Sequence, residues 1–352
     1  MNLFLNPPSS WSSPIRQLHA AWEGGRFPQA ILLDGPAGIG KKKLAMDLCA
    51  FLTCTSAEGR PCGHCFSCKL AYDPGASDHW LLPLVLEAQN RENVDKVNEA
   101  TSALLSQVVK NPYHTGLIPA AATISVHQVR HLWDRISYAA SGERVFIIAE
   151  ADCMNDNAAN ALLKTLEEVP PHTYFILTCS GRQRLLQTIQ SRCMPLRLPP
   201  LAAQEMFTIL HERGMEEPDA DLLGLSMGSV GRAMQCLERD FPTVRQQALD
   251  FLNLCFSRNW SRLFRAMDLW FGKDLDTAIF FLDVLAALLN DLSRKAGNVP
   301  PRLPSCAAQL NLPQDPSMPL RWLSQLEDAR HRLEERRGSI SVVLQTFALR
   351  CA

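Results

Sequence analysis

One stretch decides the fold: residues 144–178 have the sequence RVFIIAEADCMNDNAANALLKTLEEVPPHTYFILT. The apolar run Val145–Ala149 is rich in β-branched residues and too short for an independent helix, so it predicts a strand buried on both faces of a parallel sheet. Residues 155–168 begin with capping residues, carry leucines and alanines on one face, and are followed by two prolines, which predicts a helix. Tyr174–Thr178 is a second apolar strand, and the whole stretch therefore predicts a βαβ unit.

Two motifs in and after this unit carry a family resemblance. The sequence NALLKTLEE occupies residues 160–168 and SRC occupies residues 191–193. The combination resembles the clamp-loader branch of the AAA+ proteins, in particular the bacterial DNA polymerase III clamp-loader subunits. This resemblance implies an α/β fold: an AAA+ P-loop parallel sheet with a zinc-knuckle insertion, followed by a small helical lid domain and an all-α C-terminal collar domain.

Length and composition are consistent with this expectation and limit the number of domains, the kind of partner and the location. The 352 residues predict two or three domains, and a hydrophobic fraction of 47% allows a full core. The net charge of −1 gives no general attraction to nucleic acid, so any DNA contact has to be local. The sequence has no apolar run of about 18 residues, no pattern of a signal peptide, and 12 cysteines mostly in apolar surroundings. We therefore expect no membrane contact and a reducing, cytoplasmic location.

An expected strand at Ala30–Asp34 leads into GPAGIGKKK, the order of strand, glycine loop and helix that a phosphate-binding loop needs. Gly35, Gly38 and Gly40 would let backbone N–H groups turn toward a phosphate, and the helix N-terminus adds a favourable dipole. Lys41 stands where it would reach the β and γ phosphates. The alternative is a tight strand–helix turn without a ligand.

The groups that would hold magnesium are missing at two positions. The residue after Lys41 should carry a hydroxyl that ligates Mg²⁺, but it is Lys42, which would repel a cation. Alignment with the family's D-E-A-D pattern puts Ala149 where the metal-binding aspartate belongs, although Glu150, the water-activating position, is retained. Our hypothesis is that this chain does not hydrolyse ATP; nucleotide binding without metal stays open.

Four cysteines in residues 54–68 have the spacing of a zinc site. They are Cys54, Cys62, Cys65 and Cys68. Four thiolates close the coordination shell of Zn²⁺ and leave no place for water, so the predicted ion is structural. Cys49 and His64 are spare candidates, and reduced thiols without metal are the alternative. The family resemblance covers this module too, since related subunits carry a four-cysteine zinc module after the phosphate loop.

Two arginines receive roles only through the resemblance. Arg192 in the SRC motif would reach into the ATP site of a neighbouring subunit and stabilise charge on its γ-phosphate, as an arginine finger does. Arg232 lies in residues 228–233, which are similar to the family's sensor-2 motif, where an arginine approaches a phosphate. The alternative for Arg192 is a surface or buried structural arginine. For Arg232 it is a relic without a nucleotide, in a segment whose small residues Gly228 and Ser229 serve only a helix N-terminus.

The remaining segments divide the chain into three expected domains. They are a P-loop-like domain at residues 1–198, a lid domain at 199–238 and a collar domain at 239–352 that joins subunits in a ring. The third is helical in pattern except for Asn298–Pro319, whose prolines and polar residues predict a loop. Residues 85–122 exceed the expected family length, and the sequence assigns them no role.

A broken phosphate loop, a zinc module and a retained SRC motif together resemble the delta-prime class of this family. That class implies a non-hydrolytic stator, part of the DNA polymerase III holoenzyme, in a hetero-pentamer with gamma/tau ATPase subunits and delta. Through the complex it would meet the sliding clamp and primed DNA. Two alternatives remain: an ATP-hydrolysing subunit like gamma or tau, and a zinc-dependent DNA-binding module.

Overall fold

The protein is described by a computed structural model that covers residues 7–56, 59–87, 90–119, 121–137, 142–215, 218–271, 274–310, 315, 317–335 and 339–350. The described residues form two compact units. The first comprises those within Met1–Met206 together with Gly228–Arg232, and the second those within Phe207–Met227 and Ala233–Ala352. The division into three domains stays a prediction.

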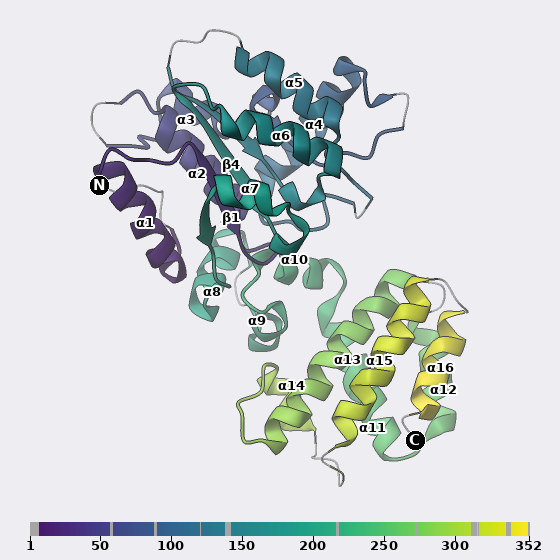
Figure 1. The fold of residues 1–352 in the computed structure, drawn as a ribbon. Coiled ribbons are helices and arrows are strands. Elements are labelled where there is room, and N and C mark those ends of the chain that lie inside the picture. Colours follow the sequence, from purple (N-terminus) through teal and green to yellow (C-terminus); the bar gives the residue numbers. More distant parts are fainter. Residues whose placement is uncertain are drawn as a thin grey trace. The chain divides into compact units, whose positions relative to one another are not determined.

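The first unit is built on a five-stranded sheet (Figure 1). Its strands are β1 (Ala30–Asp34), β2 (Trp80–Leu81), β3 (Arg144–Ile148), β4 (Thr173–Cys179) and β5 (Met194–Arg197). Their order is β2-β3-β4-β1-β5, and every pair is parallel. Since β3 pairs directly with β4 and α6 (Asp156–Glu167) connects them, the predicted βαβ unit and the α/β class are confirmed.

Seven helices precede, connect or follow the strands of this sheet along the described chain up to β5. They are α1 (Ser12–Glu23), α2 (Lys41–Thr53), α3 (Phe66–Leu70), α4 (Val94–Lys110), α5 (Val126–Ser137), α6 and α7 (Gln187–Arg192), with 3-10 turns at Ser9–Trp11, Ser77–His79, Ala151–Cys153 and Arg182–Arg184. One face of the sheet, with Leu32, Phe146 and Phe175, packs against the apolar sides of α5 and α6. Asn155 caps α6 by accepting a hydrogen bond from the Ala158 N–H at 2.8 Å, as the sequence predicted.

Two helices, α8 (Ala203–Glu212) and α10 (Val230–Glu238), contribute residues to both units. The second unit is otherwise helical and consists of α9 (Ala220–Ser226), α11 (Phe241–Phe256), α12 (Trp260–Phe271), α13 (Leu275–Ala296), α14 (Pro304–Gln309), α15 (Met318–Glu334) and α16 (Ile340–Arg350). Its core is aromatic: Phe281 packs edge-on against Phe251 at 5.7 Å between ring centroids. Among the described residues, no helix combines the length and the apolar composition needed to cross a bilayer.

One prediction in this unit was wrong: Asn298–Pro319 is not all loop, because α14 lies within it. Its first turn is held by carboxylates from other helices. Asp291 on α13 accepts hydrogen bonds from the backbone N–H groups of Arg302 and Leu303, at 2.8 and 2.6 Å. Asp221 on α9 accepts one from Ser305 at 2.9 Å. These acids satisfy donors that a helix start leaves unpaired, and no residue next to α14 in sequence announces them.

Candidate phosphate-loop and metal sites

The carboxyl ends of the parallel strands bring the predicted phosphate-loop residues together. After β1, Gly35–Gly40 turns into α2, whose N-cap Gly40 has a left-handed φ of +111°. Glu150 follows the end of β3, and Ser180 follows β4 directly. Ligand sites of open α/β sheets lie at this edge, so the loop is placed where a phosphate could be bound, and phosphate binding stays a prediction.

Lys42 and Glu150 form an ion pair at this edge, with 2.8 Å between Lys42 Nζ and Glu150 Oε1. Both side chains are largely buried, at 9% and 17% exposed. Burial raises the pKa of Glu150, but the charges of Lys42 and Lys41 more than offset it, so the pKa is lowered overall. Lys42 therefore balances the charge of Glu150 within the fold; the water-activating role that the resemblance implies for Glu150 stays a prediction.

Lys41 points back into its own loop instead of toward solvent. Its Nζ donates to the carbonyl oxygens of Gly35 and Pro36, at 2.8 and 2.7 Å, and to Ser180 Oγ at 2.9 Å. The residue is 4% exposed, and burial lowers the pKa of its ammonium group. An ammonium group has three donors, and all three are used here.

A second acid at this edge was not singled out from the sequence. The Asp152 side chain is 1% exposed and accepts hydrogen bonds from the backbone N–H groups of Ser180 and Gly181, at 3.3 and 3.0 Å. It also pairs with Arg184, whose pKa is raised by that hydrogen bond. Asp152 therefore fixes the turn after β4 that presents Ser180 to Lys41. The only signal in the sequence was an acid just beyond a predicted strand.

Arg232 lies in the segment that contacts the phosphate loop through its backbone. The N–H of the preceding Gly231 donates to the carbonyl of Gly38 at 3.0 Å, and the N–H of Arg232 is capped by Ser229 Oγ at 3.1 Å. The segment is therefore beside the loop, as a sensor-2 segment requires. The phosphate-contacting role of the arginine side chain stays a prediction.

The four predicted metal ligands form one cluster. The Sγ atoms of Cys54, Cys62, Cys65 and Cys68 all lie within 4.8 Å of one another. Cys62 and Cys68 are 3.9 Å apart at Sγ, and Cys54 and Cys65 are 4.0 Å apart. Tetrahedral Zn²⁺ with bonds of about 2.3 Å needs Sγ atoms roughly 3.8 Å apart, so the cluster can hold this ion. The thiol pKa values within the cluster are shifted in opposite directions: backbone N–H groups of Thr55 and Cys68 lower the pKa of Cys65 to about 5, whereas burial raises the pKa of Cys68 to about 12.

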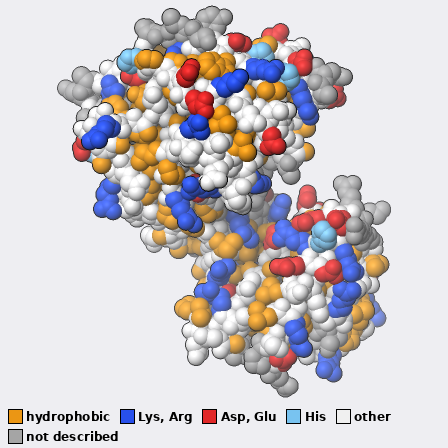
Figure 2. Space-filling view, in the orientation of Figure 1, with side chains coloured by type: hydrophobic (Ala, Val, Ile, Leu, Met, Phe, Trp, Pro, Cys, Tyr) orange, Lys and Arg blue, Asp and Glu red, His pale blue; other side chains and the backbone are white. Residues whose placement is uncertain are grey.

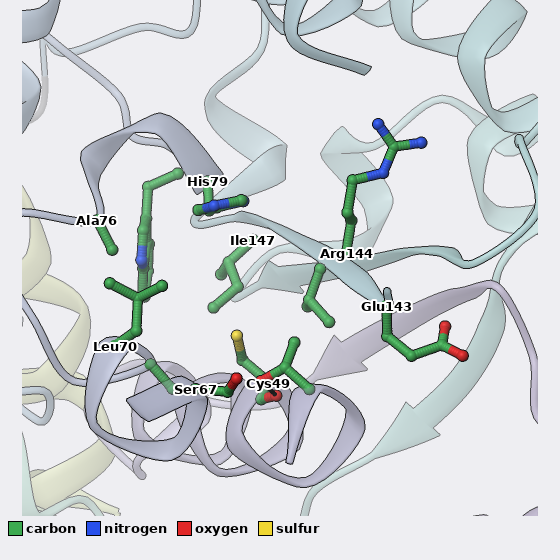
Figure 3. Close-up of a pocket in the computed structure, with 12 residues that line it drawn as sticks. Cys49, Ser67, Leu70, Ala76, His79, Glu143, Arg144 and Ile147 are labelled. Atoms are coloured by element: carbon green, nitrogen blue, oxygen red, sulfur yellow. Dashed lines mark hydrogen bonds between the residues drawn. The ribbon is translucent and has the colours of Figure 1, made fainter. Parts of the chain in front are cut away.

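Cys49, a spare ligand candidate, lies outside the cluster and lines a cavity of about 120 Å³ between α2, α3 and β3 (Figure 3). Burial raises the pKa of its thiol to about 12, so it is neutral. Figure 3 shows its sulfur directed into the cavity, whereas the charged ends of Glu143 and Arg144 point away from the centre. His64, the other spare candidate, is also outside the cluster.

Arg192 ends α7 on the surface of the first unit. Its guanidinium donates to the carbonyl of Thr188 at 3.0 Å and to Glu167 Oε1 at 2.5 Å. The side chains of Arg192 and Glu167 are 34% and 49% exposed. The arginine is therefore accessible, and its only charged partner within the described part of the chain is a surface carboxylate.

The site thus defines an α/β protein with a phosphate-type loop, no retained magnesium ligands at the two family positions, and a four-cysteine module. The family model described as "DNA polymerase III, delta subunit" matches residues 12–202. Together with the relatives named delta', this match shows that the chain belongs to the family of DNA polymerase III delta-prime clamp-loader subunits. The chain is 30% identical over 263 residues to the DNA polymerase III subunit delta' of Escherichia coli K12, which covers 73% of this chain and 70% of that one.

Two further relatives are also subunits of DNA polymerase III. The subunit delta' of Bacillus subtilis is 27% identical over 290 residues, with 81% of this chain and 78% of the relative covered. The DNA polymerase III subunit tau of Escherichia coli K12 is 30% identical over 185 residues, which is 52% of this chain and 23% of the relative. The resemblance to clamp-loader subunits, and to the delta-prime class, is therefore confirmed.

Proposed function

We propose that this chain is a non-hydrolytic subunit of the DNA polymerase III clamp loader. It would act as a stator in a hetero-pentamer with gamma/tau ATPase subunits and delta, which places the sliding clamp on primed DNA. The observation that carries the proposal is the buried ion pair of Lys42 and Glu150. A cation fills the place of a metal ligand, and the water-activating carboxylate is engaged by it.

Two ligands of the same Mg²⁺ ion are lost, because Ala149 also stands at the position of the metal-binding aspartate. Mg²⁺ both bridges the β and γ phosphates and neutralises developing charge, so hydrolysis without it is strongly impaired. Both substitutions weaken the same step, which supports a chain without ATPase activity of its own.

Arg192 supports the second part of the proposal, a catalytic contribution in trans. Its pair with Glu167 is a surface ion pair, which contributes only about 0–1 kcal/mol. A γ-phosphate with greater negative charge on an adjacent subunit can therefore take the guanidinium from Glu167 at little cost. The planar fork of donors suits that contact.

The zinc module supports a structural part in this proposal. Four thiolates would complete the shell of Zn²⁺ and leave no position for a catalytic water. Figure 2 shows basic and acidic side chains interspersed on the visible face of each unit, so surface charge does not favour general DNA binding. We expect DNA to be met through the assembled complex.

The test is a clamp loader reconstituted from this chain, its ATPase and delta partners, the sliding clamp and primed DNA. With Arg192→Ala we expect normal assembly and a loss of clamp-stimulated ATP turnover. The control is Arg26→Ala, which changes an exposed arginine of the loop after α1. An Arg192→Ala complex with wild-type turnover would rule out the finger.

The second candidate is an ATP-hydrolysing subunit, favoured by the similarity to subunit tau. Under this alternative the isolated chain turns over ATP, and Lys41→Ala abolishes that activity. If the isolated wild-type chain turns over ATP no faster than the Lys41→Ala variant, the result favours the non-hydrolytic subunit.

A further inference from the structure

The phosphate loop is in contact with a turn from the segment to which the sequence assigned no role. A Cβ atom added to Gly40 would lie 2.7 Å from Cε1 of Tyr113. One added to Gly38 would lie 2.8 Å from Cγ2 of Thr115 and 2.5 Å from Oγ of Ser229. In a phosphate loop, glycines allow close approach of the phosphates. Here the close approach is made by the chain itself.

A third glycine, Gly231, also packs closely against this turn. A Cβ atom on Gly231 would lie only 2.0 Å from the carbonyl oxygen of Tyr113. Gly231 is the second residue of α10 and its φ is not in the left-handed region, so helix geometry alone does not require glycine there. The requirement comes from the Tyr113 backbone.

Hydrogen bonds tie the same elements together from the other side. Gly231 N–H donates to the Gly38 carbonyl at 3.0 Å, and Ser229 Oγ donates to the Ala37 carbonyl at 2.8 Å. Lys41, the side chain that would reach the phosphates, is likewise engaged: its ammonium group donates to the carbonyls of Gly35 and Pro36 within the loop and to Ser180 beyond β4. A triphosphate would have to displace these contacts.

We propose that the turn Tyr113–Thr115 occludes the phosphate loop and, together with Ser229 and Gly231, holds it closed in place of a nucleotide. The loop is thus kept in one conformation without a ligand and excludes nucleoside triphosphates. This proposal concerns the isolated chain and does not depend on the assembly proposed above. It gives residues 113–115 of the unassigned segment a role.

The test is amide hydrogen exchange of Gly35–Lys41 in the full-length zinc-loaded chain, with and without millimolar ATP in magnesium-free buffer. In the wild type we expect slow exchange that ATP does not change. In the double variant Tyr113→Ala/Thr115→Gly we expect exchange of the loop ~10-fold faster, because local opening becomes easier, and slowed again by ATP.

Thr115→Val is the matched control, because the buried Thr115 hydroxyl has no hydrogen-bond partner among the described residues and valine keeps the methyl group that approaches Gly38. We expect this variant to behave as the wild type. Gly231→Ala is an independent test: alanine is the better helix former by up to ~1 kcal/mol, yet it must displace Tyr113 and speed loop exchange.

Zinc content and the exchange of β4 amides verify that each variant is folded. Three results would overturn the proposal. They are ATP protection of the wild-type loop, wild-type exchange in the double variant or Gly231→Ala, and an opened loop that does not respond to ATP. None of them involves the ATPase of the assembled complex, so the stator proposal is judged separately.

Discussion

At the scale of single residues, the chemistry of the site is decided by what surrounds Glu150. Its position in the sequence is that of a catalytic carboxylate, but its Oε1 contacts Lys42 at 2.8 Å and its Oε2 accepts from Ser180 Oγ at 3.1 Å. Both carboxylate oxygens are therefore engaged within the fold, which supports the proposal that Glu150 has a structural role here.

Glu150→Gln tests this structural role through pH. The pKa of Glu150 is lowered from its ordinary value of 4.5 by the charges of Lys42 and Lys41, which outweigh the opposing effect of burial. A carboxylate with a lowered pKa stabilises the fold above pH 4.5, and that stabilisation is lost as pH falls through the lowered value. We expect the variant to lose ~1–3 kcal/mol at neutral pH and the difference from wild type to shrink on acidification.

The measurement is chemical unfolding of the first unit at several pH values, with Glu168→Gln, a change of an exposed carboxylate in the same unit, as the control. A constant difference between Glu150→Gln and wild type down to strongly acidic pH would contradict the pairing.

At the scale of elements, short helices in this protein depend on partners outside themselves. The zinc module contains α3, which has five residues and is too short to be stable alone. The N-cap of α3 is Cys65, whose Sγ accepts a hydrogen bond from the Cys68 N–H at 3.4 Å. The small cluster around this helix consists largely of other cysteines. A bound ion would therefore supply the cohesion that the small apolar cluster lacks.

We predict one Zn²⁺ per chain after purification without added zinc. Cys62→Ser should abolish tight binding and unfold residues 59–70, because three remaining thiolates leave the shell open. Cys153→Ser, which changes a cysteine outside the cluster, should keep the metal. Metal analysis together with exchange of the α3 amides measures both effects, and a folded α3 in metal-free protein would refute the prediction.

Helix α14 depends in the same way on buried acids. Asp291 is 1% exposed and serves two backbone donors, so Asp291→Ala leaves both unpaired in the interior. We expect a loss of ~1–3 kcal/mol per unpaired group. Unfolding monitored within the second unit measures it, with exposed Asp276→Ala as the control. A loss no larger than that of the control would show that α14 does not need this cap.

At the scale of the whole molecule, the proposed function places Arg192 in an assembly. Its guanidinium is accessible at the surface of the first unit, which supports the proposal that it acts in the ATP site of a neighbouring subunit. In the reconstituted complex we expect Arg192→Ala to reduce ATP turnover by as much as ~10³-fold, the lower end for arginine fingers. Arg192→Lys should restore only part, since lysine keeps the charge but not the planar fork.

Much of this protein followed from sequence by itself: the βαβ unit, the strand–loop–helix at Gly35–Lys41, the four-cysteine cluster and the delta-prime family. The first three depend on periodicity and on motif spacing between near neighbours in the chain, which the amino-acid order records directly, and the family came from the resemblance of these motifs to known subunits. Three others were decided only by tertiary structure: the Lys42–Glu150 pair, the caps of α14 and the seating of Tyr113 against Gly231. Each joins residues far apart in the chain, and packing alone determines which distant groups meet, because a polar group that is buried must find its partner wherever the fold supplies one.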